Sequence, residues 1–286
     1  MTAHEERLLV IENIKKALEE GDSFKKVELF DPVITDEDVK RLIEPFDTER
    51  RKLKNKILSF FARKIAESET KKRNTLTEIR GIDNALSVNG GAIITQNHFN
   101  IMDNTIARLL VLECEKGNDF HIVIQETNAF MKGYFGFLMR NCNTLPVSRS
   151  MSYMAKKLKP TVKKILERDG FILIYPEQEM WFNYKKPRDL RDGAYHYAAE
   201  FCVPIIPTFV TMENTNEIGN DGFYKQNYVL HVLRPIYPER ELSVRENRDR
   251  MKMLDAEAKR ACYEEYYGIK LDESFIPERD IAGYRP

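Results

Sequence analysis

The strongest constraint on the fold is an alternation that begins near Thr75. Short apolar runs rich in β-branched residues take turns with longer stretches whose apolar residues recur at helical spacing. This alternation is typical of an α/β fold with a mixed central sheet flanked by helices. We expect strands near residues 91–96, 119–125, 171–175, 203–210 and 227–234, and helices near 102–116, 127–140, 150–168 and 190–201. A last helix should begin with a capping box at Ser243 and end at Gly268.

The first 75 residues form a different kind of region, helical and polar. One helix should stop at Gly21, a second should begin with Thr35 as its cap and end by Pro45, and a third should cover residues 49–69. We therefore divide the chain into an N-terminal helical region at residues 1–75 and an α/β domain at residues 76–286.

The third N-terminal helix is strongly basic, although acidic and basic residues balance at 45 each over the chain. Residues 50–73 hold ten Lys or Arg against two Glu. An apolar stripe accompanies them, made of Leu53, Ile57, Phe60, Phe61 and Ile65. Such a helix suits an anionic membrane surface, and the stripe could equally pack on the sheet with the lysines solvated. We expect no nucleic-acid partner, because no recognisable binding fold accompanies the charge.

The spacing of the cysteines and the hydropathy of the sequence indicate the cellular compartment in which the protein is expected. No two of the four cysteines have the spacing of zinc or redox sites, and the first residues lack a signal-peptide pattern. No apolar run approaches the roughly 20 residues that span a bilayer. We expect a cytoplasmic protein with reduced thiols and no metal site, which lies on a membrane if it meets one.

His98 and Asp103 are the most informative pair in the sequence. His98 follows the apolar run 91–95, where a strand should give way to a loop. A carboxylate that holds one ring nitrogen fixes the tautomer of a histidine and makes it a better proton acceptor. Alternatively, Asp103 stabilises the start of the next helix. His121 and Glu126 share the spacing, but a continuous strand would separate them by roughly 16 Å.

The segment from Asn97 to Asp103 resembles the first sequence block of the glycerolipid acyltransferase family, Asn-His, four residues, Asp. Further segments follow in the family's order over about residues 78–236. Residues 80–84 resemble the stretch that precedes the first block, and residues 133–150, ending in Arg149-Ser150, resemble the second. Residues 171–177 resemble the aromatic-Pro-Glu of the third block, and residues 193–194 with 203–207 resemble the fourth. Four blocks in order are far more specific than one.

The resemblance implies an O-acyltransferase of phospholipid biosynthesis. It would move a fatty acyl group from acyl-coenzyme A or acyl carrier protein to the hydroxyl of a lysophosphatidate-like glycerolipid, without a cofactor. His98 would act as general base and Asp103 would orient it, while Asn97, Arg149 and Glu177 would bind substrate. The expected location is the inner face of the cell membrane, as a peripheral protein. The oligomeric state stays open.

The third block departs from the family after Glu177. The family continues with Gly-Thr-Arg, but this chain has Gln178-Glu179-Met180-Trp181. The acceptor could therefore be another lysolipid or a glycolipid, or the chain could be a non-catalytic lipid-binding relative. We expect Gln178 and Trp181 to contact substrate, with core packing as the alternative for Trp181. The basic residues at 185, 186 and 188 could replace the lost charge, but a solvated loop is favoured.

Overall fold

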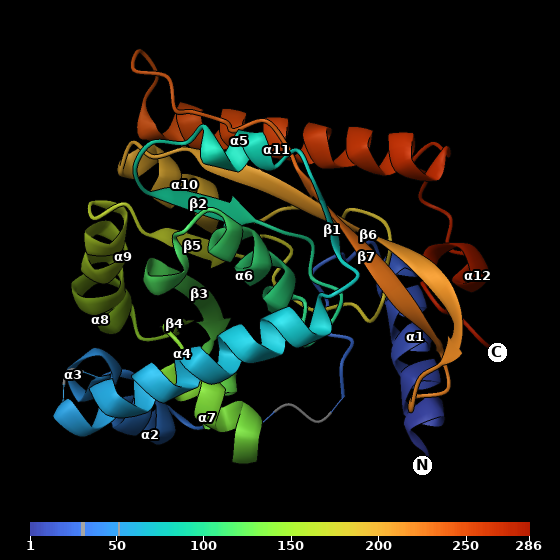
Figure 1. The fold of residues 1–286 in the computed structure, drawn as a ribbon, viewed down its shortest axis with the longest axis horizontal. Helices are drawn as coiled ribbons and strands as arrows, with labels where there is room; N and C mark the ends of the chain where they lie inside the picture. The colour runs from blue at the N-terminus through green and yellow to red at the C-terminus, as the bar shows by residue number, and fades with distance from the viewer. Residues whose placement is uncertain (30–31, 51) are drawn as a thin grey trace.

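Within the described residues, the strands form one seven-stranded sheet in the order β1-β7-β6-β2-β5-β3-β4 (Figure 1). The computed structural model describes residues 1–29, 32–50 and 52–286, apart from the side chains of residues 47, 50 and 118. All neighbouring strands are parallel except β6 and β7, so the sheet is mixed, as predicted. The strands are β1 (Glu78–Arg80), β2 (Ala92–Thr95), β3 (Phe120–Gln125), β4 (Thr144–Val147), β5 (Phe171–Ile174), β6 (Ile205–Ile218) and β7 (Tyr224–Val232).

Helices cover both faces of the sheet (Figure 1). Side chains alternate along a strand, so Ile93 packs with α9, α10 and α11 on one face while Ile94 packs with α5 and α6 on the other. Burial on both faces explains why β2 reads as a continuous apolar run. These helices are α5 (Ile82–Leu86), α6 (Asn104–Glu113), α9 (Lys159–Leu166), α10 (Gly193–Glu200) and α11 (Val244–Tyr267).

The N-terminal helices lie in two separate places (Figure 1). Helix α1 (Ala3–Glu19) packs beside the β6–β7 hairpin and the C-terminal segment, in a cluster that includes Trp181, Phe223 and Ile281. Helix α4 (Leu53–Arg73) packs instead on α6 and on α7 (Gly133–Asn141). The remaining short helices are α2 (Asp36–Asp38), α3 (Phe46–Arg50), α8 (Met151–Tyr153) and α12 (Pro277–Asp280).

The predicted helix ends at Thr35, Ser243 and Gly268 are confirmed. Thr35 and Ser243 both make complete capping boxes, and Gly268 ends α11 in the left-handed conformation. Several predicted helices are interrupted. The helix that begins after Thr35 is α-helical for three residues and becomes π-helical at residues 39–43. Residues 126–130 form a 3-10 turn before α7, and a π-helical segment at residues 154–158 separates α8 from α9. Strands β1 and β4 were not predicted, because neither is a continuous apolar run: β1 is Glu-Ile-Arg with both charged residues exposed, and β4 begins with a threonine and contains a proline.

The apolar stripe of α4 faces solvent, so the alternative in which it packs on the sheet is wrong. Phe60 and Phe61 are 51% and 56% exposed, and Leu53 is 75% exposed. The buried face of α4 consists of small residues instead, at positions 59, 62, 66 and 70. Small side chains allow α4 to lie close to α6 and α7 while its bulky residues point outward.

Among the described residues, no helix combines the length and the apolar character that crossing a membrane requires.

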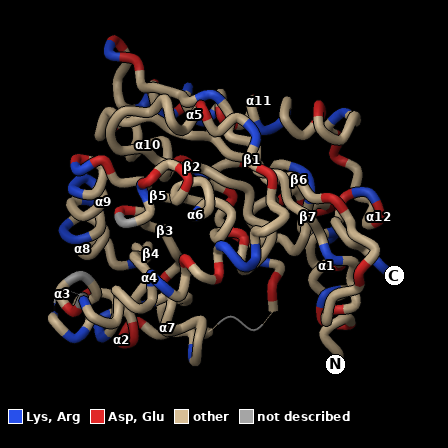
Figure 2. The backbone as a smooth tube through the Cα atoms, viewed as in Figure 1, with Lys and Arg blue, Asp and Glu red and all other residues tan. Residues whose placement is uncertain are grey.

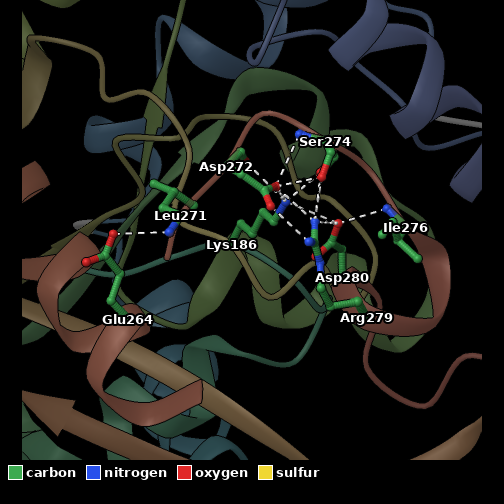
Figure 3. A network of polar contacts seen from close by, with 8 residues as sticks. All are labelled: Lys186, Glu264, Leu271, Asp272, Ser274, Ile276, Arg279 and Asp280. Carbon is green, nitrogen blue, oxygen red and sulfur yellow. Dashed lines mark hydrogen bonds and ion pairs between the residues drawn. The ribbon is translucent and has the colours of Figure 1, made fainter. Parts of the chain in front are cut away.

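The predicted solvated loop at residues 185–188 is wrong for Lys186 and Arg188. Lys186 is 3% exposed and donates hydrogen bonds to Asp272 and to the Ser274 carbonyl, at 2.8 and 2.6 Å (Figure 3). It also pairs with Asp280 at 3.2 Å. Arg188 is buried against Glu177. A buried charge requires a partner, so these side chains fix the loop to the C-terminal segment and to the third block.

Candidate active site

The loop that carries His98 is held by helix α11 and by strand β6. Thr95, at the end of β2, donates a hydrogen bond to buried Asp255 of α11 at 2.7 Å. The Asn97 amide donates to the Val210 carbonyl of β6 at 3.1 Å and accepts from the Val210 N–H at 2.8 Å. Asn97 is buried and both polar atoms of its side chain are used. Its position indicates that it holds the loop.

Asp103 collects four hydrogen-bond donors. One oxygen, Oδ2, accepts from Nδ1 of His98 at 2.8 Å and from the N–H groups of Phe99 and Asn100 at 2.9 and 3.2 Å. The other, Oδ1, accepts from the Tyr175 hydroxyl at 2.6 Å. The side chain makes no capping hydrogen bond to α6. The geometry therefore favours the pairing with His98 over the alternative role at the helix start.

Tyr175 completes the setting of His98. Its ring stacks on the imidazole, with the ring centroids 4.0 Å apart and the planes 19° from parallel. Burial, together with the charge of Asp103, holds the pKa of Tyr175 well above its usual range. The hydroxyl therefore stays protonated and continues to donate to the carboxylate at neutral pH. With Nδ1 bound to Asp103, Nε2 of His98 is the atom that can accept a proton.

Glu177 braces the same loop from the third block. Its Oε2 accepts a hydrogen bond from the His98 N–H at 3.1 Å and pairs with the Arg188 guanidinium at 3.0 Å. Arg188 also donates its own N–H to Oε1 of Glu177 at 3.1 Å. Glu177 is 2% exposed, so it holds two loops together. Gln178 follows with a φ of 62°, the left-handed conformation that the family's glycine would adopt freely.

A cavity of about 560 Å³ opens beside His98, at the carboxyl ends of β3 and β5. Its wall is mostly apolar and includes Ile122, Ile124, Phe135, Leu138, Met139 and Cys142. Polar groups on the same wall include His98, Thr105, Arg108, Tyr175 and Gln178. A largely apolar space with a few polar groups is the usual form of a lipid or small-molecule site.

The structure brings only some of the predicted site residues to this cavity. His98 and Gln178 line it, and Asp103 lies directly behind His98. The Arg149 guanidinium is instead bound to Glu126 and Asp36, at 2.8 and 3.2 Å.

Trp181 is corrected to a core residue. Its side chain is fully buried, packs in the cluster of α1, and donates its indole N–H to the Lys25 carbonyl at 3.0 Å. A residue without exposed surface cannot contact a substrate.

Two cavity residues were not predicted as site residues. Tyr175 stands in the third block, but only its hydrogen bond to Asp103 reveals its role. Arg108 interrupts the apolar helix α6, and a charge on an otherwise apolar face is the signal that could have identified it. Within the described part of the chain, no group of three or more His, Cys, Asp or Glu side chains is arranged to hold a metal ion.

Comparison with known proteins places the chain beside a protein family and a solved structure. Residues 72–211 match the family model described as Acyltransferase. The fold is similar to the crystal structure of a 1-acyl-sn-glycerophosphate acyltransferase from Thermotoga maritima, with a TM-score of 0.51 and 16% sequence identity. That similarity covers 93% of this chain and 96% of the other. No curated protein sequence matches the chain.

Proposed function

Because this chain belongs to the glycerolipid acyltransferase family through its domain at residues 72–211, we propose that it transfers a fatty acyl group from a thioester to a glycerolipid hydroxyl. The donor would be acyl-coenzyme A or acyl carrier protein, and the acceptor a lysophosphatidate-like lipid. The observation that carries the proposal is the His98–Asp103 hydrogen bond of 2.8 Å at the wall of an apolar cavity.

His98 would act as the general base. Its Nε2 takes the proton of the acceptor hydroxyl as that oxygen attacks the thioester carbonyl carbon. The C–S bond then breaks, and the imidazolium returns the proton to the departing sulfur, so that an ester and a thiol are the products. Asp103 keeps Nδ1 protonated and stabilises the imidazolium. The hydroxyl is activated directly, so the reaction needs no nucleophile from the protein.

The acceptor is the open part of this proposal. The family's basic residue is absent after Gln178, and the Arg149 guanidinium is already bound to two carboxylates. These observations favour a second candidate, acylation of another lysolipid or of a glycolipid hydroxyl. The third candidate is a lipid-binding relative without turnover, and the intact His98–Asp103 pair argues against it.

A transfer assay with labelled acyl donors tests the reaction. The purified protein is given acyl-coenzyme A or acyl carrier protein with a panel of phosphate-bearing and neutral lysolipids. His98→Ala should lower the rate by about 10²–10⁴-fold, the usual contribution of a general base. Asp103→Asn should also lower it strongly, because the amide cannot hold the imidazolium.

His196 provides the matched control, since it lines the same cavity but pairs with Glu200 at 3.5 Å. His196→Ala should retain most of the activity. Equal rates for the wild type and His98→Ala would refute the mechanism. Lipid binding without transfer to any acceptor would support the binding relative.

We further propose that α4 rests on an anionic membrane at the cytoplasmic side. Its exposed apolar stripe belongs to segment 50–73, whose sequence holds ten basic residues, and this combination suits an anionic lipid surface. Figure 2 shows further Lys and Arg residues along α8 and α9. The four cysteines are free thiols, which supports a reducing compartment. Ala66 and Glu69 of α4 line the cavity, so the membrane-facing helix also forms part of the substrate wall.

A further inference from the structure

Arg108 is a buried cation without a carboxylate partner. It is 3% exposed and lines the cavity beside His98. Its Nη2 donates to the Cys142 sulfur at 3.4 Å, its guanidinium lies 5.1 Å from the ring centre of Phe120, and its Nε has no hydrogen-bond partner. Among the residues whose side chains are described, no carboxylate lies within ion-pair distance of it.

The contacts of Arg108 are too weak to explain its burial. A thiol sulfur is a poor hydrogen-bond acceptor, and a single aromatic ring offsets only part of the cost of removing a charge from water. Buried charges in proteins are normally paired, so an unpaired guanidinium at a cavity wall indicates an anion that arrives with the ligand.

Other cations near the cavity already have partners. Lys159 pairs with Glu200 at 2.5 Å, and Arg149 pairs with Glu126. Arg191 donates to Gln178 and, unlike Arg108, is exposed to solvent. Arg108 lines the same cavity as Tyr175 and His98. Within the described residues, it is therefore the cation best placed to meet an anion inside the cavity.

We propose that Arg108 binds an anionic oxygen group of the lipid inside the cavity, and so supplies the positive charge that the third block lacks. The inference rests on the proposed function and narrows its acceptor to an acidic lipid. The phosphate of a lysophospholipid and the carboxylate of an acidic glycolipid share this chemistry. A planar guanidinium can hold either through two parallel hydrogen bonds.

The proposal is tested by measuring the binding of three probes that share a ten-carbon length and differ in their polar group. The probes are decyl phosphate, decanoate and decanol, and calorimetry measures their affinities. Arg108→Met should weaken binding of the charged probes by about tenfold to a hundredfold, the usual effect of losing a charge-assisted hydrogen bond, and leave decanol unchanged. Arg108→Lys should retain part of the affinity, because the charge remains and the fork is lost. The probe that loses more identifies the phosphate or the carboxylate as the preferred group.

Lys159→Met is the matched control, since Lys159 lines the same cavity but is paired. It should change the three affinities equally or not at all. Without ligand, Arg108→Met should melt no lower than the wild type, because replacing an unpaired buried charge by an apolar side chain is neutral or stabilising. A lower melting temperature, or an equal loss for decanol and decyl phosphate, would overturn the proposal.

Binding needs no turnover, so this result is separate from the transfer assay. A protein that binds decyl phosphate through Arg108 but transfers no acyl group would refute the proposed reaction and leave the anion site intact. In an active protein, Arg108→Met should raise KM for a phosphate-bearing acceptor about tenfold or more and leave KM for monoacylglycerol unchanged.

Discussion

Asp103 shows how a single carboxylate can organise a loop and a base together. Two of its four donors are backbone N–H groups of the loop, one is the imidazole, and one is the Tyr175 hydroxyl. The backbone bonds keep the carboxylate in place in the absence of substrate. The side-chain bonds divide its two oxygens between the base and the tyrosine, so Tyr175 acts on His98 through Asp103.

Tyr175→Phe tests this arrangement at the residue scale. Without the hydroxyl, the carboxylate loses one donor and attracts the imidazolium more strongly, so the acidic limb of the kcat/KM profile should move to higher pH. The rate at its optimum should fall several-fold. The measurement is a pH–rate profile with a saturating donor.

Tyr195→Phe is the control for that experiment, because Tyr195 makes the same kind of bond to buried Asp255 away from the cavity wall. Tyr195→Phe should lower the free energy of unfolding by about 1.5–3 kcal/mol, the usual value for a hydrogen bond to a charged group. It should leave the acidic limb of the kcat/KM profile at the same pH. If the pH–rate profiles of Tyr175→Phe and the wild type coincide, the Tyr175 hydroxyl has no effect on His98 and the ring contributes only packing.

Helix α4 is the element whose sequence and packing disagree most with a simple amphipathic pattern. Its large apolar side chains are outside, and its small ones are inside. Hydrophobic periodicity alone would have buried the stripe. The close approach of α4 to α6 and α7 leaves room only for Ala, Ser and Thr, and this packing constraint cannot be read from periodicity.

The double variant Phe60→Ser, Phe61→Ser should weaken sedimentation with anionic vesicles about tenfold or more, because each lost aromatic side chain removes apolar burial in the lipid. Its melting temperature should stay close to that of the wild type, since both residues are exposed. Met253→Ser is the control, because Met253 is 53% exposed on α11, across the sheet from α4. Unchanged sedimentation of the double variant would remove α4 from the membrane proposal.

The elements of the sheet were predictable to different degrees. The five predicted strands can be recognised in the sequence by their β-branched apolar runs, and four of them are buried along most of their length. Strand β6 runs on to Ile218 because β7 pairs with its polar second half, which only the partner strand reveals. In the site, the spacing predicted the His98–Asp103 pair. Arg108 was not predicted as a site residue, and Trp181 was predicted to contact substrate, because the surroundings of both come from distant segments.

The N-terminal helix and the C-terminal segment pack together on one loop of the α/β domain. Helix α1 and the C-terminal segment meet on the loop at residues 181–188, where Trp181 and Lys186 are buried. Lys186 has Asp272 and Asp280 as its partners, and Arg279 joins the same network (Figure 3).

Lys186→Met should lower the free energy of unfolding by about 3 kcal/mol at neutral pH, because the buried carboxylate of Asp280 loses one of its partners. Hydrogen bonds from Lys186, then from Arg279 and Ser274, hold the pKa of Asp272 well below its usual range. A lowered pKa stabilises the fold above the ordinary value near pH 4, and this contribution is lost as the pH falls. The difference between variant and wild type should therefore narrow below about pH 4.

Urea unfolding, followed through the fluorescence of Trp181, measures this difference. Trp181 is the single tryptophan of the chain, and it is buried in the same cluster as Ile281, which follows Asp280 in the sequence. Lys185→Met is the control, since Lys185 lies over the ring of Tyr267, 5.2 Å from its centre, and is less buried than Lys186. Equal losses for the two lysines would contradict the buried network as the source of stability.

The order of strands in the sheet also determines when each strand can find its partners while the chain is being synthesised. Strand β2, which leads to His98, pairs only with β5 and β6, and its last residue is held by Asp255 of α11. Ribosomes add about 5–20 residues per second, so the loop of His98 waits several seconds for its partners. These lie fewer than a hundred residues downstream in β5 and more than a hundred downstream in β6 and α11. Until then, β2 is an apolar segment with two open edges, exposed to chaperones and to other nascent chains.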